Sequence, residues 1–150
     1  MRLFLWVSLL LLLTVSACST SPSCATASCP STVHFQGSLR FRSANDSLDV
    51  TVCKNGSCAR GTVSQSACSV SGLIDATCRI SIDGTGNGTL SVDFLASAKE
   101  DLKDGDLYTV RVLRGQTNES LVDVTKPVSY KTTRPNGPEC EPSCRSADMS

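Results

Sequence analysis

The chain has 150 residues, with 14 lysines and arginines against 14 aspartates and glutamates, so its formal net charge is zero. Charges of both signs are interspersed, no strongly basic face is required, and nucleic acid is not expected as a partner. The length suits one domain with a modest core, and the nine cysteines make the redox compartment an immediate question.

The first 17 residues have the pattern of a secretory leader. Arg2 is their only charge, and the apolar run at 3–15 is interrupted by one Trp, one Ser and one Thr. A charged start followed by a short apolar run is typical of a signal peptide, whereas a membrane-spanning helix needs about 20 apolar residues. We therefore predict a cleaved leader at 1–17.

The leader ends in Val15-Ser16-Ala17-Cys18. This order, an apolar residue, two small residues and a cysteine, resembles the lipobox of bacterial lipoproteins. The resemblance implies that the Cys18 thiol receives a diacylglycerol, that the leader is removed and that the new amino group is acylated. Two or more acyl chains anchor a protein stably. Ser19 is not the Asp of an inner-membrane retention signal, so the resemblance implies the outer membrane. The alternative is a secreted protein cleaved before an unmodified Cys18.

Lipidation of Cys18 would leave eight cysteines, and an even number in an exported chain indicates a disulfide framework. These cysteines are Cys24, Cys29, Cys53, Cys58, Cys68, Cys78, Cys140 and Cys144.

Residues 18–32 contain Ser, Thr, Ala, Pro and Cys without a charge, which predicts a flexible tether. Residues 33–42 then alternate apolar and polar side chains, as in a half-buried strand, and open the predicted domain 33–133. The polar side of this strand includes His34, the only histidine of the chain.

The sharpest local signal is the sequence from Cys53 to Cys58, with Asn55-Gly56 at its centre. Asn-Gly suits a type I′ turn, in which both central φ angles are positive. Cys53 then faces Cys58 in a non-hydrogen-bonded pair, with Cα atoms about 4.5 Å apart, which a disulfide tolerates. We predict a Cys53–Cys58 bridge. Farther on, Cys78 should point inward from a strand at 76–82, with Cys68 as its nearest unassigned partner.

Further strands are predicted at 48–53, 59–64, 76–82, 90–96, 108–112 and 121–131, with one helical turn at 97–103. About seven short strands, separated by turns and with no long helix after the leader, predict an all-β fold. A β-sandwich is the preferred architecture, and a small barrel is the alternative.

Leu102, Asp106 and Tyr108 follow one another in the order of a tyrosine corner. This order resembles the corner of immunoglobulin-like sandwiches, where the tyrosine opens strand F. The resemblance implies an immunoglobulin-like antiparallel β-sandwich. Val110 occupies the position of the second core cysteine of antibody domains, so that disulfide is absent here.

The remaining segment, 134–150, is rich in proline and contains Cys140 and Cys144, and no core is predicted there. Spacing does not decide whether these two cysteines pair with each other or with Cys24 and Cys29. Four thiolates could also bind zinc, but an oxidising compartment favours disulfides.

Catalytic and metal-binding patterns are weak. A Ser-His-Asp site would need a nucleophile and a carboxylate beside His34, and no Gly-x-Ser-x-Gly sequence is present. Five acidic residues could in principle gather around calcium but resemble ordinary turn residues: Asp83, Glu100, Asp101, Asp104 and Asp106. We predict no catalysis, no metal and no cofactor.

The sequence thus predicts a lipoprotein of the bacterial envelope, held at the outer membrane by its lipid. It would act as a structural or protein-binding module with an unidentified protein partner. The alternative is an envelope protein that binds a small solute or a metal ion.

Overall fold

The computed structural model describes residues 24, 27–97, 102–115 and 117–149, and this part of the chain contains ten strands and no helix. In chain order the strands are β1 (Ser31–Arg40), β2 (Leu48–Lys54), β3 (Ser57–Val63), β4 (Cys68–Gly72), β5 (Ala76–Ile82), β6 (Asn87–Ala96), β7 (Leu107–Arg114), β8 (Glu119–Pro127), β9 (Lys131–Thr133) and β10 (Cys144–Asp148).

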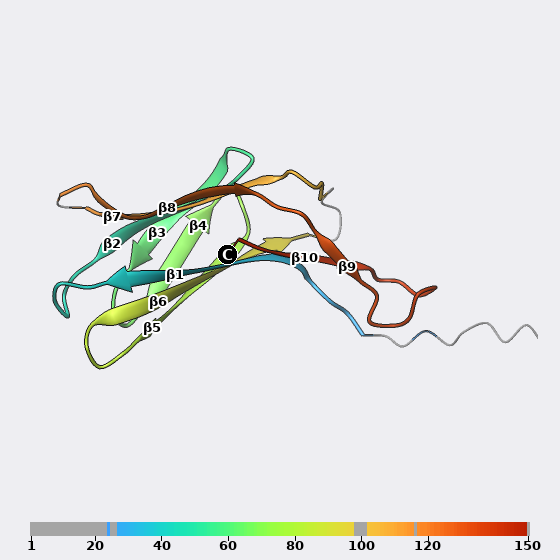
Figure 1. Ribbon diagram of the computed structural model, residues 1–150, viewed down its shortest axis with the longest axis horizontal. Helices are drawn as coiled ribbons and strands as arrows, with labels where there is room; N and C mark the ends of the chain where they lie inside the picture. The colour runs from blue at the N-terminus through green and yellow to red at the C-terminus, as the bar shows by residue number, and fades with distance from the viewer. Residues whose placement is uncertain (1–23, 25–26, 98–101, 116, 150) are drawn as a thin grey trace, which may run out of the picture.

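The strands form two five-stranded sheets with the orders β5-β6-β1-β10-β9 and β4-β3-β2-β7-β8. Every pairing is antiparallel except that of β1 with β10, which is parallel. Figure 1 shows the two sheets as two layers. The all-β prediction is confirmed, and the arrangement is two sheets rather than the single closed sheet of the barrel alternative.

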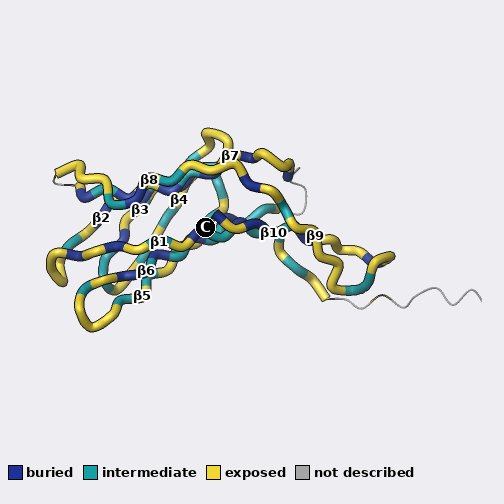
Figure 2. The backbone as a smooth tube through the Cα atoms, viewed as in Figure 1, coloured by how far each residue is buried: buried dark blue, intermediate teal, exposed yellow. Residues whose placement is uncertain are grey.

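The core lies between the two sheets because alternate residues of the central strands point inward. Its nearly inaccessible side chains come from both layers and include Val33, Phe35, Leu90 and Val92 on one side and Leu48, Val50, Val52, Val110 and Val112 on the other. The rings of Phe94 and Tyr108 meet edge to face across the layers, with centroids 4.9 Å apart. Burial of this apolar area is the main stabilising term of the fold. Figure 2 shows how buried and exposed residues alternate along the strands.

The predicted hairpin between β2 and β3 is confirmed. Asn55 and Gly56 have φ angles of 48° and 86°, as a type I′ turn requires. Cys53 pairs with Cys58 in the ladder, and the two form a disulfide with Cα atoms 4.1 Å apart. A second disulfide joins Cys68 of β4 to Cys78 of β5 and so links the two sheets.

The expectation that 134–150 contributes nothing to the core is wrong. Strand β10 lies parallel to β1, with Thr32 in register with Ser146, and β9 pairs with its other edge. Ala147 and Met149 are buried in the core. The sequence of β10 is short and polar, so its hydrophobic pattern alone does not predict a strand.

Two disulfides hold this C-terminal segment in place. Cys24 is bonded to Cys140 and Cys29 to Cys144, with Cα–Cα distances of 5.6 and 5.9 Å. We call them the tether–tail bridges, since they join the predicted tether 18–32 to the tail 134–150. The last residues of that tether, Ser31 and Thr32, already belong to β1.

All seven predicted strands are present, but the total is higher than expected because of β4, β9 and β10. Strand β4 is a polar edge strand in a segment for which no strand is predicted, and β9 has only three residues. Most of the helical turn predicted at 97–103 lies outside the described residues. The leader, Cys18 and the start of the tether also lie outside them. No helix in the described part is long and apolar enough to cross a membrane.

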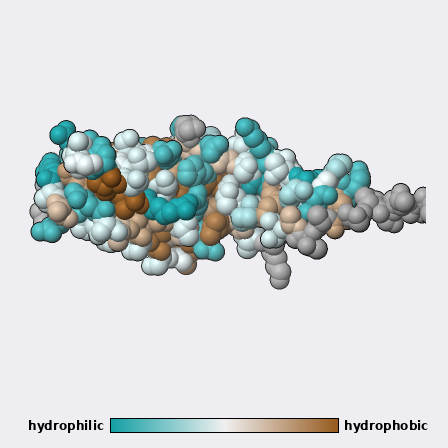
Figure 3. Space-filling view, turned by 90° about the horizontal axis from the view of Figure 1, so that it is seen from below, coloured by the Kyte–Doolittle hydropathy of each residue, from teal (hydrophilic) through white to brown (hydrophobic). Residues whose placement is uncertain are grey.

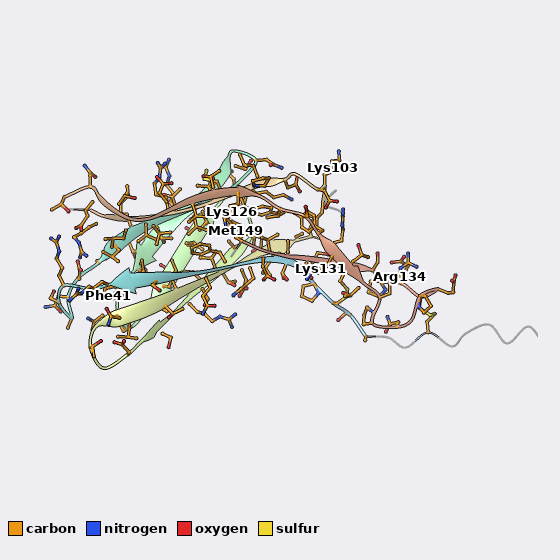
Figure 4. All side chains as sticks on the ribbon, viewed as in Figure 1. Phe41, Lys103, Lys126, Lys131, Arg134 and Met149 are labelled. Carbon is orange, nitrogen blue, oxygen red and sulfur yellow. A yellow bond between two sulfur atoms is a disulfide. The ribbon has the colours of Figure 1, made fainter. Side chains whose placement is uncertain are left out.

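The domain is elongated (Figure 1 and Figure 3), and different loops lie at its two ends. Residues 27–30 and the loop at 134–143 lie together at one end, which we call the tether end. The loops at 41–47 and 83–86 lie at the opposite end, with the turn that joins β7 to β8. We call this the distal end. In Figure 4, Phe41 marks the distal end and Arg134 the tether end.

Candidate functional site

The distal end is built around Arg114, the last residue of β7. The even-numbered residues of this strand point inward, so Arg114 follows Tyr108, Val110 and Val112 into the space between the sheets. Its side chain is only 7% exposed. A guanidinium in such a place needs hydrogen-bond acceptors for nearly all of its donors.

The acceptors of Arg114 come from three segments. Its guanidinium is paired with Asp46 in the β1–β2 loop. It also donates to Glu119 Oε2 at the start of β8, at 3.1 Å, and to the backbone carbonyl of Arg40, at 3.0 Å. Arg114 therefore links the β1–β2 loop, the end of β1 and the start of β8.

Further hydrogen bonds extend this linkage over the distal loops. Arg42 donates to Glu119 Oε2 at 2.7 Å, so one carboxylate is shared by two arginines. The Arg42 backbone N–H donates to Asp46 Oδ2 at 2.9 Å, and Gln65 in the β3–β4 loop donates to the Ser43 carbonyl at 3.3 Å. The distal loops are thus held together by charged and polar contacts.

A cleft of about 530 Å³ opens beside these residues. Its lining comprises Arg40, Phe41, Arg42, Thr85, Arg114, Glu119 and Leu121. The guanidinium groups of Arg42 and Arg114 are paired with the carboxylates of Glu119 and Asp46, and Arg40 in the lining adds a third positive charge. Arg42 is 61% exposed and can offer further donors to an incoming group. Because a guanidinium binds a carboxylate through parallel hydrogen bonds, the cleft is suited to an acidic ligand group.

The predicted corner residues lie at the tether end and form a separate polar cluster. The Tyr108 hydroxyl is 2.8 Å from the Tyr130 hydroxyl, which donates to Asp106 Oδ2 at 3.2 Å. In a tyrosine corner the hydroxyl bonds to backbone a few residues upstream, and here it contacts another side chain instead. Leu102 is buried, and its carbonyl accepts a hydrogen bond from Arg145. The three corner residues are therefore close together, but the hydrogen bonding differs from that of the corner.

Asp106 is the charged centre of this cluster. Burial acts to raise the pKa of its carboxyl, but donors from Asn55 and from the Lys103 backbone oppose that effect, as does the Lys54 ammonium. Asn55 Nδ2 lies 2.9 Å from Asp106 Oδ1, and Lys54 Nζ lies 3.6 Å from Oδ2. Together they hold the Asp106 pKa below its ordinary value. Burial raises the pKa of Tyr108 and of Tyr130.

These contacts give the cluster a structural role, since it ties the β2–β3 turn to the start of β7.

A second cleft of about 490 Å³ lies beside this cluster, lined in part by Lys54, Phe94 and Tyr108. Leu73, also in its lining, is the most exposed large apolar side chain of the described residues, at 86%.

His34 lies on the outer face of its sheet, in a chain of polar side-chain contacts. Its Nδ1 is 2.7 Å from Asp93 Oδ1, and Asp93 Oδ2 accepts a hydrogen bond from Arg79 at 2.6 Å.

Of the acidic residues considered for calcium, Asp83 accepts hydrogen bonds from the Thr85 backbone and hydroxyl and from Asn87. These bonds, led by that of the Thr85 side chain, lower the Asp83 pKa.

Asp104 accepts a hydrogen bond from the Tyr130 backbone at 2.9 Å, whereas Glu100 and Asp101 lie outside the described residues. Among the residues that the structure describes, no three His, Cys, Asp or Glu side chains are grouped as a metal site would require. The four cysteines considered for zinc form the tether–tail bridges.

Arg114 was not among the residues singled out from sequence motifs. The sequence does contain one indication that Arg114 is buried. The alternation of inward-pointing residues at Tyr108, Val110 and Val112 continues to position 114. An inward charge at the end of a strand indicates a buried ion pair. The partners, Asp46 and Glu119, are not adjacent in any local pattern.

Comparisons with protein-family models, with curated proteins and with solved structures gave no match to this chain.

Proposed function

We propose that this chain is a lipoprotein of the bacterial envelope, anchored in the outer membrane through Cys18, whose immunoglobulin-like domain binds a protein partner at its distal end. The anchor is proposed on the sequence Val15-Ser16-Ala17-Cys18. Four disulfides within the described residues support an oxidising compartment outside the cytoplasm.

The strand order supports the immunoglobulin-like assignment. If β1 to β8 correspond to strands B, C, C′, C″, D, E, F and G, the sheets become D-E-B and C″-C′-C-F-G. These are the neighbours found in variable-type immunoglobulin domains, apart from strand A. Here β10 lies beside β1, where strand A would be, and runs parallel to it. The chain also differs from antibody domains in lacking the core disulfide between strands B and F.

The arrangement of the distal loops is the observation on which the binding function rests. In variable domains the B–C, C′–C″ and F–G loops form the binding surface. The corresponding connections here are the β1–β2, β3–β4 and β7–β8 loops, which are joined through Arg114, Arg42 and Gln65. Loops that are already held in place lose less conformational entropy when a partner binds than mobile loops do.

The chemistry of the cleft supports one kind of partner. Its excess positive charge and its Phe41 and Leu121 side chains fit a protein segment with a carboxylate next to an apolar residue. The tether enters at the opposite end of the domain, so the distal loops would face away from the membrane (Figure 1). The tether–tail bridges keep the tether attached at that end.

The test uses the domain from residue 19 onward, immobilised through its N-terminus and exposed to detergent-solubilised envelope proteins. Arg42→Ala removes a cleft guanidinium, and we expect capture of the specific partner to weaken about tenfold, the loss of about 1.4 kcal/mol. The control is Arg60→Ala, which removes an exposed arginine on β3, away from the cleft. Equal capture by both variants would contradict binding at the distal cleft.

A small anionic solute is the second candidate for the same cleft. The observation that favours it is the cleft volume of about 530 Å³, which lies in the range of small-molecule sites. Calorimetric titration with citrate distinguishes the two. Stoichiometric binding that is lost in Arg42→Ala would favour a solute, and heats no larger than those of dilution would favour the protein partner.

A further inference from the structure

The four disulfides within the described residues differ in what surrounds their sulfur atoms. Each tether–tail bridge includes one cysteine that is buried. Cys68 and Cys78 pack against the hydrophobic core between the sheets. Of these four bridges, Cys53–Cys58 is the one in which neither cysteine is buried or packed against the core.

Cys53 and Cys58 lie on the outer face of their sheet. The neighbouring residues Val52 and Ala59 are inaccessible and point into the core. Because successive side chains of a strand point to opposite faces, the two cysteines point outward, and both are half-buried. A thiol in solution can therefore approach this bridge without opening the core.

The adjacent positions on this face of β2, β3 and β7 carry no carboxylate. Thr51 and Arg60 are each two residues from one of the cysteines, and Thr109 is in register with Cys53 on β7. Residues two positions apart in a strand share a face and are roughly 7 Å apart. The species that attacks a disulfide is a thiolate anion, and these neutral and positive neighbours do not repel it.

The fold around the bridge does not depend on the sulfur–sulfur bond. Strand β2 pairs with β3 on one side and with β7 on the other along its whole length. The turn is held separately, because Asn55 Nδ2 donates to Asp106 Oδ1 at 2.9 Å and the Leu107 N–H donates to Asn55 Oδ1 at 2.7 Å. A bridge between residues only 5 positions apart also restricts the unfolded chain little. After reduction, Cys53 and Cys58 would therefore stay opposite each other, with their thiols placed to form the bond again.

We propose that Cys53–Cys58 is a redox-active disulfide, which accepts two electrons from an external dithiol while the domain stays folded. Exposed disulfides are more easily reduced than enclosed structural ones, and they are the ones with regulatory or catalytic roles. The bridge lies beside the Asp106 cluster, at the tether end of the domain. The proposal therefore depends neither on the distal cleft nor on a lipid at Cys18.

The exchange has two steps, and each step breaks one bond to sulfur and forms another. A thiolate of the dithiol attacks one sulfur of the bridge, and the other sulfur leaves with the electron pair as a thiolate. The second thiol of the dithiol, also as a thiolate, then attacks the dithiol sulfur of this mixed disulfide, and the remaining cysteine leaves. The dithiol is thereby oxidised to a disulfide, and its two protons pass to Cys53 and Cys58, which become thiols.

The main test treats the domain from residue 19 onward with dithiothreitol at neutral pH and without denaturant. Samples are quenched with acid at successive times, and the free thiols are alkylated and located by mass spectrometry of peptides. We expect Cys53 and Cys58 to be labelled together and at least about tenfold faster than the other disulfide-bonded cysteines, because the other bridges must first be exposed by local opening of the fold. The circular-dichroism spectrum should be unchanged at that stage.

A second test distinguishes a redox-active bridge from a structural one. Structural disulfides of secreted proteins resist reduction by glutathione, whereas exposed, redox-active ones have higher reduction potentials. In an excess of reduced over oxidised glutathione, we expect Cys53 and Cys58 to be reduced in a measurable fraction of the molecules. Replacement of this mixture by oxidised glutathione alone should restore the bridge.

Two double variants are the matched controls. Cys53→Ser combined with Cys58→Ser should show no labelled cysteine at the time of the first step, whereas Cys68→Ser combined with Cys78→Ser should retain that step. Where the second variant does not fold, the order of labelling in the native domain decides.

The proposal is overturned if Cys53 and Cys58 of the native domain are labelled no faster than the other cysteines. It is also overturned if the domain unfolds when they are reduced, or if the bridge stays fully oxidised in an excess of reduced glutathione. Arg42→Ala, which tests the distal cleft, should leave the rate of labelling unchanged.

Discussion

Replacement of Arg114 by Met removes the group that joins the distal loops. The Arg114 and Asp46 side chains are 7% and 13% exposed, so the substitution leaves a poorly hydrated carboxylate without its cation. It also leaves the Arg40 carbonyl without the donor that it has in the native domain. Breaking a buried ion pair from one side typically costs about 3–5 kcal/mol. At about 4 °C per kcal/mol for a domain of this size, Tm should fall by about 15 °C.

Arg111→Met is the matched control, because Arg111 lies on the same strand but points to the outer face. It pairs with Asp123 at 3.1 Å, and the two side chains are 51% and 47% exposed. An exposed pair of this kind contributes at most about 1 kcal/mol. The two variants therefore make the same chemical change in a buried and an exposed ion pair of β7.

The assay is urea denaturation followed by circular dichroism, with the disulfides intact and at neutral pH. Arg114→Met should unfold at a much lower urea concentration than Arg111→Met, with an unchanged slope. Arg114→Met combined with Asp46→Asn should recover part of the loss, because the unpaired charge is then absent. A loss below about 1 kcal/mol for Arg114→Met, or the same loss in both arginine variants, would refute the assignment of Arg114 as a buried link.

Other predictions concern the disulfides, the pH dependence of stability and the proposed membrane anchor. The tether–tail bridges close loops of up to 116 residues in sequence separation, whereas Cys53–Cys58 closes one of 5. In the chain-entropy model, serine replacement of all four tether–tail cysteines should cost about 7 kcal/mol and that of Cys53 and Cys58 about 2 kcal/mol, measured by urea denaturation; equal losses would contradict the model. Because the Asp106 pKa is lowered in the folded state, its contribution is present above the unfolded pKa and is lost as pH falls through the folded one. In Asp106→Asn, Tm should therefore fall less steeply at acidic pH than in the native domain. A change in Tm that is the same at all pH values would argue against this. Cys18→Ser should move the protein from the membrane to the soluble fraction, and retention in the membrane pellet after a high-salt wash would locate the anchor elsewhere.

The sequence was most informative where local pattern determines local structure. The Asn55-Gly56 turn, the bridge between Cys53 and Cys58, and the inward face of β7 follow from turn chemistry and period-two alternation. Each of these features is set by residues within about ten positions of one another. Half-apolar strands must bury their apolar faces against one another, and this favours two packed sheets or a small barrel, of which the structure has the two sheets.

The C-terminal strand shows where such reasoning fails. Strand β10 consists of Cys144-Arg145-Ser146-Ala147-Asp148, which has neither the length nor the apolar content of a predictable strand. Its position is determined by covalent bonds to residues more than a hundred positions away. Eight cysteines allow many pairings, and their spacing does not select among them. The contacts of Arg114 with Asp46 and Glu119 depend in the same way on strand order rather than on local pattern.

The position of the tether–tail bridges relates the distal cleft to the proposed anchor. Cys29 lies two residues before the start of β1, and its partner Cys144 opens β10, so the tether is attached to two adjacent strands at the same end. Because β1 and β10 are parallel, both strands run from this attachment toward the distal end. The distal cleft begins where β1 ends, at Arg40. If Cys18 is lipidated, β1 therefore leads from the anchored end of the domain to the distal cleft, which would face away from the membrane.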